Sequence, residues 1–275
     1  MRRRNPVSWR TSAPFILCHF LPLFGLFTGF ALVDLVLVVV LFEVRMFFIT
    51  AGYHRYFAHK SFQMNRAMQF VFAFGGLTAA QKGPLWWAAH HRTHHRYTDT
   101  DRDPHTPLRG FWWSHIGWIL SGEYGATNYE VIEDFARYPE LRFLNRHDWI
   151  GPWSLAVASF LIGGWSGLFV GFFGSTVLLW HATFTVNSFA HVFGRRRYET
   201  DDLSRNSLGV ALLTGGEGWH NNHHHYPKSA RQGFYWWEID VTYGVLRLLA
   251  WLGLVHDLRQ PTAAALDARR VTMKV

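Results

Sequence analysis

Two long apolar stretches alternate with polar segments along the chain. The first covers residues 14–49 and contains three charged residues, and the second covers residues 149–194 and contains none. A membrane-spanning helix needs about 20 apolar residues, so each stretch predicts a pair of spans, although the first is short for two. Glycines near 25–29 and 163–167 supply the turns. The predicted spans lie roughly at residues 14–30, 32–52, 150–166 and 168–190.

These stretches also fit two other interpretations. An arginine-rich start followed by an apolar core is also typical of a signal peptide. However, the first stretch is too long, and no clear small-residue cleavage site ends it. The second stretch could be a buried helical hairpin of a soluble protein, but its length without any charge favours the bilayer.

The pairing of the spans fixes a topology. Two passes followed by two more place the polar segments 53–149 and 191–275 on the same side as the N-terminus. Arg2, Arg3, Arg4 and Arg10 indicate that this side is the cytoplasm. The pattern therefore predicts one domain over residues 1–275: an all-α integral membrane protein with four transmembrane helices, a cytoplasmic helical cap and both termini cytoplasmic.

Composition supports the membrane interpretation. Hydrophobic residues make up 49% of the chain and charged residues 17%, below the roughly 25% charged content of soluble domains. The net charge of +8 does not indicate nucleic acid, because the basic residues form no stripe or known motif and cytoplasmic loops carry the same excess. The single cysteine excludes an internal disulfide, so a metal site must use His, Asp, Glu or Asn.

The 17 histidines are clustered rather than scattered. Residues at i, i+3 and i+4 share one helix face, so HRTHH and HNNHH each direct three imidazoles the same way. In HRYFAH the two histidines are five apart, about 140° around an α-helix, and must lie at a helix end or turn to share a site. The candidate ligands are His54, His59, His91, His94, His95, Asn187, His191, His220, His223 and His224.

Nine imidazoles and one amide exceed the needs of one metal, because zinc takes four ligands. Two metals with four or five nitrogens each would use them all. Imidazole suits iron, copper, nickel and zinc alike, so ligand type does not select the metal. His90 and His225 extend two clusters but fall outside the ligand faces, and His105 is expected to order a loop. Structural roles are expected for the isolated histidines, which are His19, His115, His147, His181 and His256.

Acidic residues near the clusters have two interpretations each. The three aspartates of YTDTDRDPH could orient ligand imidazoles through the second ring nitrogen, or the Asp103-Pro104 pair could simply end a helix and start a turn. Glu217 in GGEGWH could likewise support a ligand or cap a helix start.

These motifs resemble those of the membrane fatty acid desaturases, in particular the stearoyl-CoA type. ITAGYHRYFAH is similar to the first histidine box of that family, HRTHHRYTDTDRDPH to the second, and NSFAH with GEGWHNNHHHYP to the third region. The resemblance covers about residues 49–227 and implies a cytoplasmic di-iron centre above four transmembrane helices. One iron would be held by His54, His59, His91, His95 and His223. The other would be held by His94, His191, His220 and His224, with Asn187 acting through a water.

The resemblance also implies the reaction. Two Fe2+ ions and O2 would insert a cis double bond into a saturated long-chain acyl group, with delta-9 acyl-CoA chemistry as the expectation. A bacterial-like chain without a fused cytochrome b5 would take electrons from a separate ferredoxin, rubredoxin or cytochrome b5-like protein with its reductase, at the bacterial inner membrane. Animal members of the family carry an Arg-Asp pair before the second histidine box that helps to hold CoA. In this chain Ala89 and His90 occupy that position. The carrier is therefore open between CoA, carrier protein and phospholipid.

Three rival functions remain at this point. An alkyl-chain hydroxylase on a similar scaffold is the closest, although the first pair and the DPH segment favour a desaturase. A metal transporter would place histidines along a membrane path, whereas the boxes lie in polar segments. A structural metal would close with four ligands, fewer than are available here.

Overall fold

The computed structural model describes residues 7–271, and the prediction for the arginines at the very start of the chain lies outside them. Helices make up nearly all the regular structure, which confirms the all-helical fold class; the described sheet is one pair of two-residue antiparallel strands. The elements are α1 (Trp9–Phe20), η1 (Leu21–Phe24), α2 (Gly25–Thr28), α3 (Leu32–Phe47), η2 (Phe48–Ala58), β1 (Gln63–Met64), α4 (Arg66–Leu77), α5 (Pro84–Tyr97), η3 (Pro107–Arg109), η4 (Trp113–Gly117), α6 (Trp118–Leu120), α7 (Glu133–Ala136), α8 (Pro139–Arg146), α9 (Ile150–Ser166), η5 (Gly167–Gly174), α10 (Ser175–Val192), α11 (Leu208–Leu213), α12 (His220–His225), α13 (Val241–Trp251), β2 (Val255–His256) and α14 (Ala263–Asp267).

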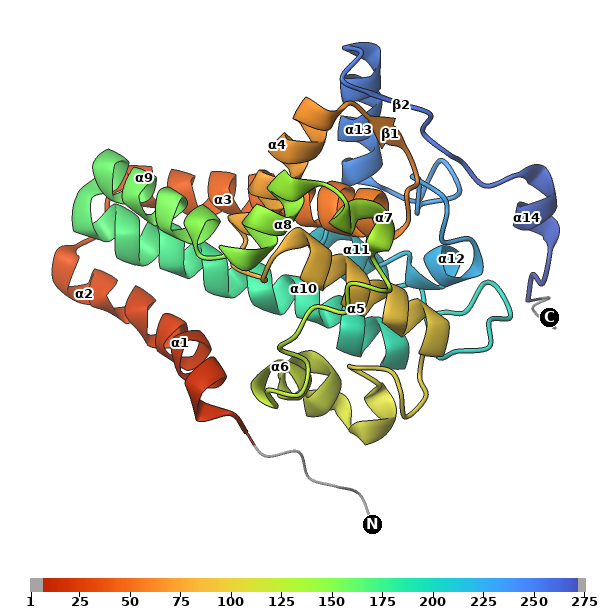
Figure 1. The fold of residues 1–275 in the computed structure, drawn as a ribbon, viewed down its shortest axis with the longest axis horizontal. Helices are drawn as coiled ribbons and strands as arrows, with labels where there is room; N and C mark the ends of the chain where they lie inside the picture. Colours follow the sequence, from red (N-terminus) through yellow and green to blue (C-terminus); the bar gives the residue numbers. More distant parts are fainter. Residues whose placement is uncertain (1–6, 272–275) are drawn as a thin grey trace.

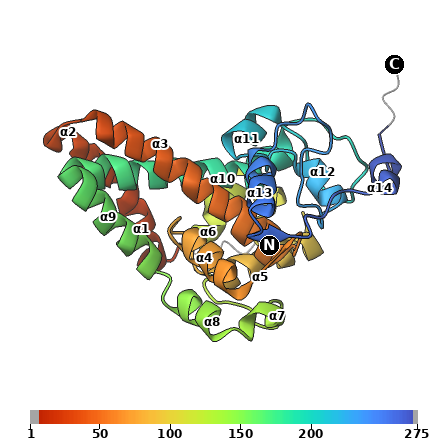
Figure 2. The same ribbon diagram turned by 90° about the horizontal axis from the view of Figure 1, so that it is seen from above.

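The molecule has two parts (Figure 1). The long helices α3, α9 and α10 extend together to one end, with α1 and α2 beside them, and the shorter helices α5, α11, α12 and α13 gather at the other end. Figure 2 shows the same division from a second direction. The apolar stretches of the sequence therefore form one end of the molecule, and the histidine-rich polar segments meet at the other.

By length and composition, one continuous helical stretch among the described residues could cross a membrane. It covers Ile150–Val192, with a mean hydropathy of 1.8 in its most apolar window. The chain reverses within it at Gly164, whose φ of 63° and ψ of −148° are not helical, so η5 returns beside α9 and leads into α10 (Figure 1). Glycine adopts this conformation without the clash that a Cβ would cause. The reversal lies inside the turn predicted at residues 163–167.

The N-terminal apolar stretch also forms helices. An apolar helical segment covers Ser12–Thr28, and α3 starts after a break at Gly29, where φ is 79°. Large side chains here face outward, including Phe27 at 85% and Leu32 at 77% exposure. Outward apolar side chains over whole helices are what a lipid-facing surface requires.

Close packing holds α4 against η2. A Cβ added at Gly75 would lie 2.4 Å from the Phe48 ring, and one added at Gly76 would lie 2.2 Å from the ring of Tyr53. Both aromatic rings therefore occupy space that only glycine leaves free. This contact helps to fix η2, the element that carries the first histidine pair.

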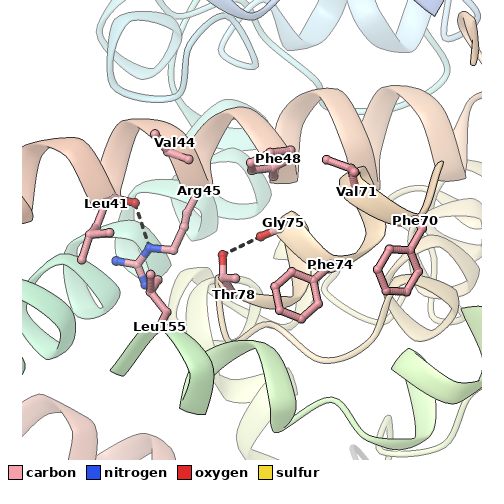
Figure 3. Close-up of a pocket in the computed structure, with 10 residues that line it drawn as sticks. All are labelled: Leu41, Val44, Arg45, Phe48, Phe70, Val71, Phe74, Gly75, Thr78 and Leu155. Atoms are coloured by element: carbon pink, nitrogen blue, oxygen red, sulfur yellow. Dashed lines mark hydrogen bonds between the residues drawn. The ribbon is translucent and has the colours of Figure 1, made fainter. Parts of the chain in front are cut away.

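An apolar groove of about 300 Å³ lies between α3, α4 and α9 (Figure 3). Its lining includes Phe48, Phe70 and Phe74 and no histidine. At one side Arg45, itself 1% exposed, donates from Nε to the Leu41 carbonyl at 2.8 Å. The groove is therefore separate from the histidine clusters.

Candidate metal centre

Nine histidines, contributed by four helices and one helix cap, converge in two neighbouring groups. Within each group the candidate ligand atoms lie within 4.8 Å of one another. The first group contains His54, His59, His91, His95 and His223, and the second contains His94, His191, His220 and His224. These are the same two sets of imidazoles that the resemblance assigned to two metals.

Helix η2 brings the first pair together. It is a π-helix, and the His59 N–H donates to the His54 carbonyl at 3.2 Å, five residues earlier. A π-helix bonds i to i+5, so residues five apart come to the same side, unlike in an α-helix. The two rings lie 4.8 Å apart, with His59 as the C-cap. The α-helical angle of about 140° therefore does not apply to this segment.

Helices α5 and α12 each serve both groups. On α5 the i, i+4 pair His91 and His95 joins the first group, and His94 joins the second. On α12 the pair His220 and His224 joins the second group, and His223 joins the first. Each helix therefore faces the space between the two groups, as the i, i+3, i+4 spacing predicted.

The nitrogen spacing suits metal coordination. Nε2 of His223 lies 3.0 Å from Nε2 of His54 and 2.9 Å from Nε2 of His95. In the second group, Nε2 of His191 lies 2.9 Å from Nε2 of His220. Two nitrogens at right angles around one metal, each with a bond of about 2.1 Å, would be about 3.0 Å apart. The distances thus match adjacent positions on a metal with more than four ligands.

Carboxylates hold the opposite ring nitrogens. Asp103 accepts from Nδ1 of His94 at 2.9 Å, and Asp202 accepts from Nδ1 of His224 at 2.8 Å. Asp99 accepts from Nδ1 of His191 at 3.2 Å, and Glu217 contacts Nδ1 of His54. A proton held on Nδ1 leaves the lone pair of a neutral ring on Nε2, the atom that faces its group.

Unpaired nitrogens test whether a metal fits. Nε2 of His94 and Nε2 of His224 are buried without a hydrogen-bond partner among the described residues. A buried nitrogen lone pair without a partner is costly, and a cation placed among these lone pairs would offset that cost. The donor set is all imidazole, which suits iron among other transition metals. The residues therefore fit a pair of transition-metal ions.

Burial favours the neutral form of several of these rings. It lowers the pKa of His220 and His223 well below the ordinary value, and the neighbouring imidazoles lower it further. A neutral ring is the form that binds a metal. Glu217, in contrast, is kept in its charged form. Burial alone would raise the pKa of Glu217, but His54 and Arg55 hold that pKa at about 2.

A buried ion-pair network supports the first group. Arg55, 1% exposed, donates to Glu217 at 2.9 Å and lies 3.0 Å from Asp240. Gln232 donates to Glu217 at 3.0 Å. Glu217 therefore contacts a ligand histidine and the guanidinium beside it, so of its two predicted roles the structure shows the supporting contact.

Other residues singled out in the sequence lie outside the two groups. Asn187 is half-buried on α10, one turn before His191, and makes no side-chain hydrogen bond to a described residue. His90 bonds through Nδ1 to the Trp86 carbonyl at 2.8 Å, and His225 through Nε2 to the Ala265 carbonyl at 2.6 Å. Neither extra histidine belongs to a cluster.

The three aspartates of the second histidine box do not all contact ligand histidines. Asp99 and Asp103 contact ligand imidazoles, whereas Asp101 is exposed. His105 packs against His94 with ring centroids 4.2 Å apart. The sequence gives no signal for Asp202, because this residue lies in a loop outside every histidine motif and no spacing links it to His224.

Three histidines expected to be isolated form a hydrogen-bonded chain. Nε2 of His19 lies 3.0 Å from Nε2 of His181, and Nδ1 of His181 lies 3.0 Å from Nε2 of His115. Nδ1 of His115 lies 2.9 Å from the Ser188 hydroxyl. The chain joins α1, η4 and α10 away from the two groups. This is a structural role, although the three residues are not isolated from one another.

Comparisons with known proteins agree with the site. The family model described as "Fatty acid desaturase" matches residues 27–250. The sn-2 palmitoyl-lipid 9-desaturase of Nostoc sp. (strain 36) is 43% identical over 215 residues, which are 76% of this chain and 75% of the relative. The acyl-CoA 5-desaturase AL21 of Anemone leveillei is 41% identical over 79% of this chain and 68% of the relative. The sn-1 stearoyl-lipid 9-desaturase of Anabaena variabilis is 40% identical over 77% and 78%.

Proposed function

The chain belongs to the fatty acid desaturase family, and from that membership we propose an O2-dependent enzyme that inserts a cis double bond at carbon 9 of a saturated long-chain acyl group. The observation that carries the proposal is the convergence of nine imidazoles into two adjoining groups with carboxylates behind them. In this proposal the chain is one desaturase domain over residues 1–275.

Iron is the metal we propose for both groups. The first ion would be held by His54, His59, His91, His95 and His223, and the second by His94, His191, His220 and His224, with Asn187 acting through a water. When bound, the iron pair would supply the O2 chemistry that removes two hydrogens from adjacent methylenes. The electrons would come from a separate ferredoxin, rubredoxin or cytochrome b5-like donor with its reductase.

The protein's own residues supply positioning and exclusion of water. Asp99, Asp103 and Asp202 hold the Nδ1 protons, which fixes the ring orientation and leaves Nε2 free to bind. His94 and His223 are each 1% exposed. Little water reaches these rings, which limits competing reactions at the site.

We propose that the four predicted spans, residues 14–30, 32–52, 150–166 and 168–190, cross the bilayer and that the polar segments and both termini are cytoplasmic. The outward apolar side chains of Phe27, Leu32 and Leu161 support the membrane contact. The reversal at Gly164 supports two passes rather than one within residues 150–192. Acyl-CoA is the carrier expected from the sequence. A membrane lipid is the alternative, because the Nostoc and Anabaena relatives are named lipid desaturases.

Expression in a desaturase-null host tests the function. Gas chromatography of fatty acid methyl esters should show a new cis monoene, and isolated lipid and CoA fractions should show which carrier was desaturated. A hydroxylated chain without an alkene would assign the protein to the hydroxylases instead. Inserted protein that forms neither product, although loaded with iron, would contradict the proposal.

A further inference from the structure

A row of aromatic rings leads away from the second histidine group. The ring centroids of His94 and His105 are 4.2 Å apart, those of His105 and Trp118 are 5.3 Å apart, and those of Trp118 and Tyr124 are 6.1 Å apart. Trp86 stacks on Trp118 at 5.9 Å with an angle of 8° between the planes. A continuous series of ring contacts therefore joins a candidate ligand to the loop after α6.

Trp118 differs from its neighbouring tryptophans. It is 7% exposed, and its Nε1 is buried without a hydrogen-bond acceptor among the described residues. By contrast, Nε1 of Trp86 donates to the Tyr124 carbonyl at 2.7 Å, and Nε1 of Trp113 donates to the Pro104 carbonyl at 3.2 Å. If Trp118 lost an electron, no described residue is hydrogen-bonded to its Nε1 to take the proton, so the ring would stay a strong oxidant.

Tyr124, in contrast, has a proton acceptor and partial access to solvent. Its ring is half-buried, and the Glu123 carboxylate and the Arg109 guanidinium are near enough to act on the pKa of its hydroxyl. Burial raises the pKa of Tyr124, Glu123 raises it further and Arg109 opposes the rise. The phenol therefore keeps its proton at neutral pH, and the carboxylate can accept that proton if the phenol is oxidised.

We propose that His105, Trp118 and Tyr124 form an escape route for oxidising equivalents when no acyl chain occupies the site. One electron passes from the Tyr124 phenol through Trp118 to the oxidised metal centre, which is reduced by one electron. The phenolic proton moves to Glu123, and a neutral tyrosyl radical remains. A soluble thiol then returns one electron and one proton to the radical and becomes a thiyl radical, two of which combine to a disulfide. Glu123 releases its proton to the solvent. The proposal rests on the proposed function and adds a protective activity to it.

Freeze-quench electron paramagnetic resonance tests the route. Iron-loaded protein in detergent is reduced, freed of reductant and mixed with O2 without acyl substrate. The wild type should show a tyrosyl radical, and peptide mass spectrometry should find oxidation at Tyr124. In Tyr124→Phe the tyrosyl signal should be lost and oxidation should accumulate on Trp118. In Trp118→Phe both signals should be lost, and ligand histidines should be oxidised several-fold faster.

Two exposed aromatic residues off the row provide matched controls. Trp112, 70% exposed, and Tyr129, 44% exposed, should tolerate replacement by Phe with an unchanged radical. A wild type without a protein radical, or a Tyr124→Phe signal equal to that of Tyr129→Phe, would overturn the route. Double-bond formation is measured in separate portions of the same iron-loaded preparations, which receive acyl substrate and reductant. Desaturation without a radical contradicts the route alone, whereas iron-loaded protein that gives neither contradicts the proposed function as well.

Discussion

At the residue scale, the carboxylates behind the histidines determine which ring nitrogen is free. Asp103 shows this most fully, because it accepts hydrogen bonds from Nδ1 of His94 and from the backbone N–H groups of Asp99 and His105. One side chain thus orients a ligand candidate and shapes the loop after α5. Burial alone would raise the pKa of Asp103, but its histidine contacts lower it, so it is ionised at neutral pH.

We therefore expect Asp103→Asn to weaken metal binding. The amide removes the charge that holds the Nδ1 proton of His94, and losses of about 10–100-fold in metal affinity are typical when such a partner is removed. Iron titration with elemental analysis measures the effect. Asp101→Asn is the control, because Asp101 lies two residues away and is exposed. Equal affinity in both variants would contradict the role of Asp103.

Two adjacent histidines allow a second test at this scale. His224 has an unpaired Nε2 within the second group, whereas His225 bonds to a backbone carbonyl and stacks on Tyr198 with centroids 3.9 Å apart. We expect His224→Ala to lose about one iron per chain and desaturase activity. His225→Ala should keep both irons. Full iron content in His224→Ala, measured by elemental analysis of folded protein, would remove His224 from the ligand set.

At the scale of elements, the sequence shows which rings share a helix face but not which kind of helix carries them. The i, i+3, i+4 spacing on α5 and α12 predicted common faces, and the structure places those rings in the two groups. The five-residue spacing of His54 and His59 was interpreted with α-helical angles. His59 does lie at a helix end, as the C-cap of η2, and the π-helical geometry of η2 brings the two rings to the same side. Whether this segment forms an α-helix or a π-helix depends on tertiary contacts, such as those of Phe48 and Tyr53 with α4.

An ion pair between elements gives a pH-dependent prediction. Asp134 on α7 accepts from Arg92 on α5 at 2.9 and 3.1 Å and also pairs with Lys60. Burial would raise the pKa of Asp134, but these donors lower it below 3.8. A carboxyl with a lowered pKa stabilises the fold above its ordinary pKa, and this contribution is lost as the pH falls through the lowered value.

At neutral pH we expect Asp134→Asn to cost about 1 kcal/mol, or about 2–4 °C in Tm. The difference from the wild type should shrink as the pH falls below 3.8. Glu133→Gln, at an exposed neighbouring position, is the control. Thermal unfolding in detergent at a series of pH values measures both variants. A difference that stays constant down to the lowest pH would show that the charge of Asp134 is not its cause.

At the scale of the whole molecule, local sequence patterns predicted the helical fold class and the clustering of the histidines, but they did not predict contacts between residues far apart in the sequence. Apolar stretches predicted an all-helical chain, and clustered histidines predicted nine rings at one place. Nothing in the sequence linked Asp202 to His224 or Gln232 to Glu217, because loop closure over such distances leaves no periodic signal. The chain of His19, His181 and His115 was equally hidden, since its members lie on three elements.

The proposed topology can be tested on the whole molecule with single cysteines. After Cys18→Ser, cysteine is placed at exposed positions near the predicted turns, Phe30 or Trp165, and in the polar segments, Glu130 or Lys228. If the protein crosses the bilayer four times, a membrane-impermeant maleimide should label the first two only from outside intact cells. It should label the other two only in inverted vesicles. Outside labelling at Glu130 or Lys228 would contradict a cytoplasmic metal centre, because the same polar segments carry most of the ligand candidates.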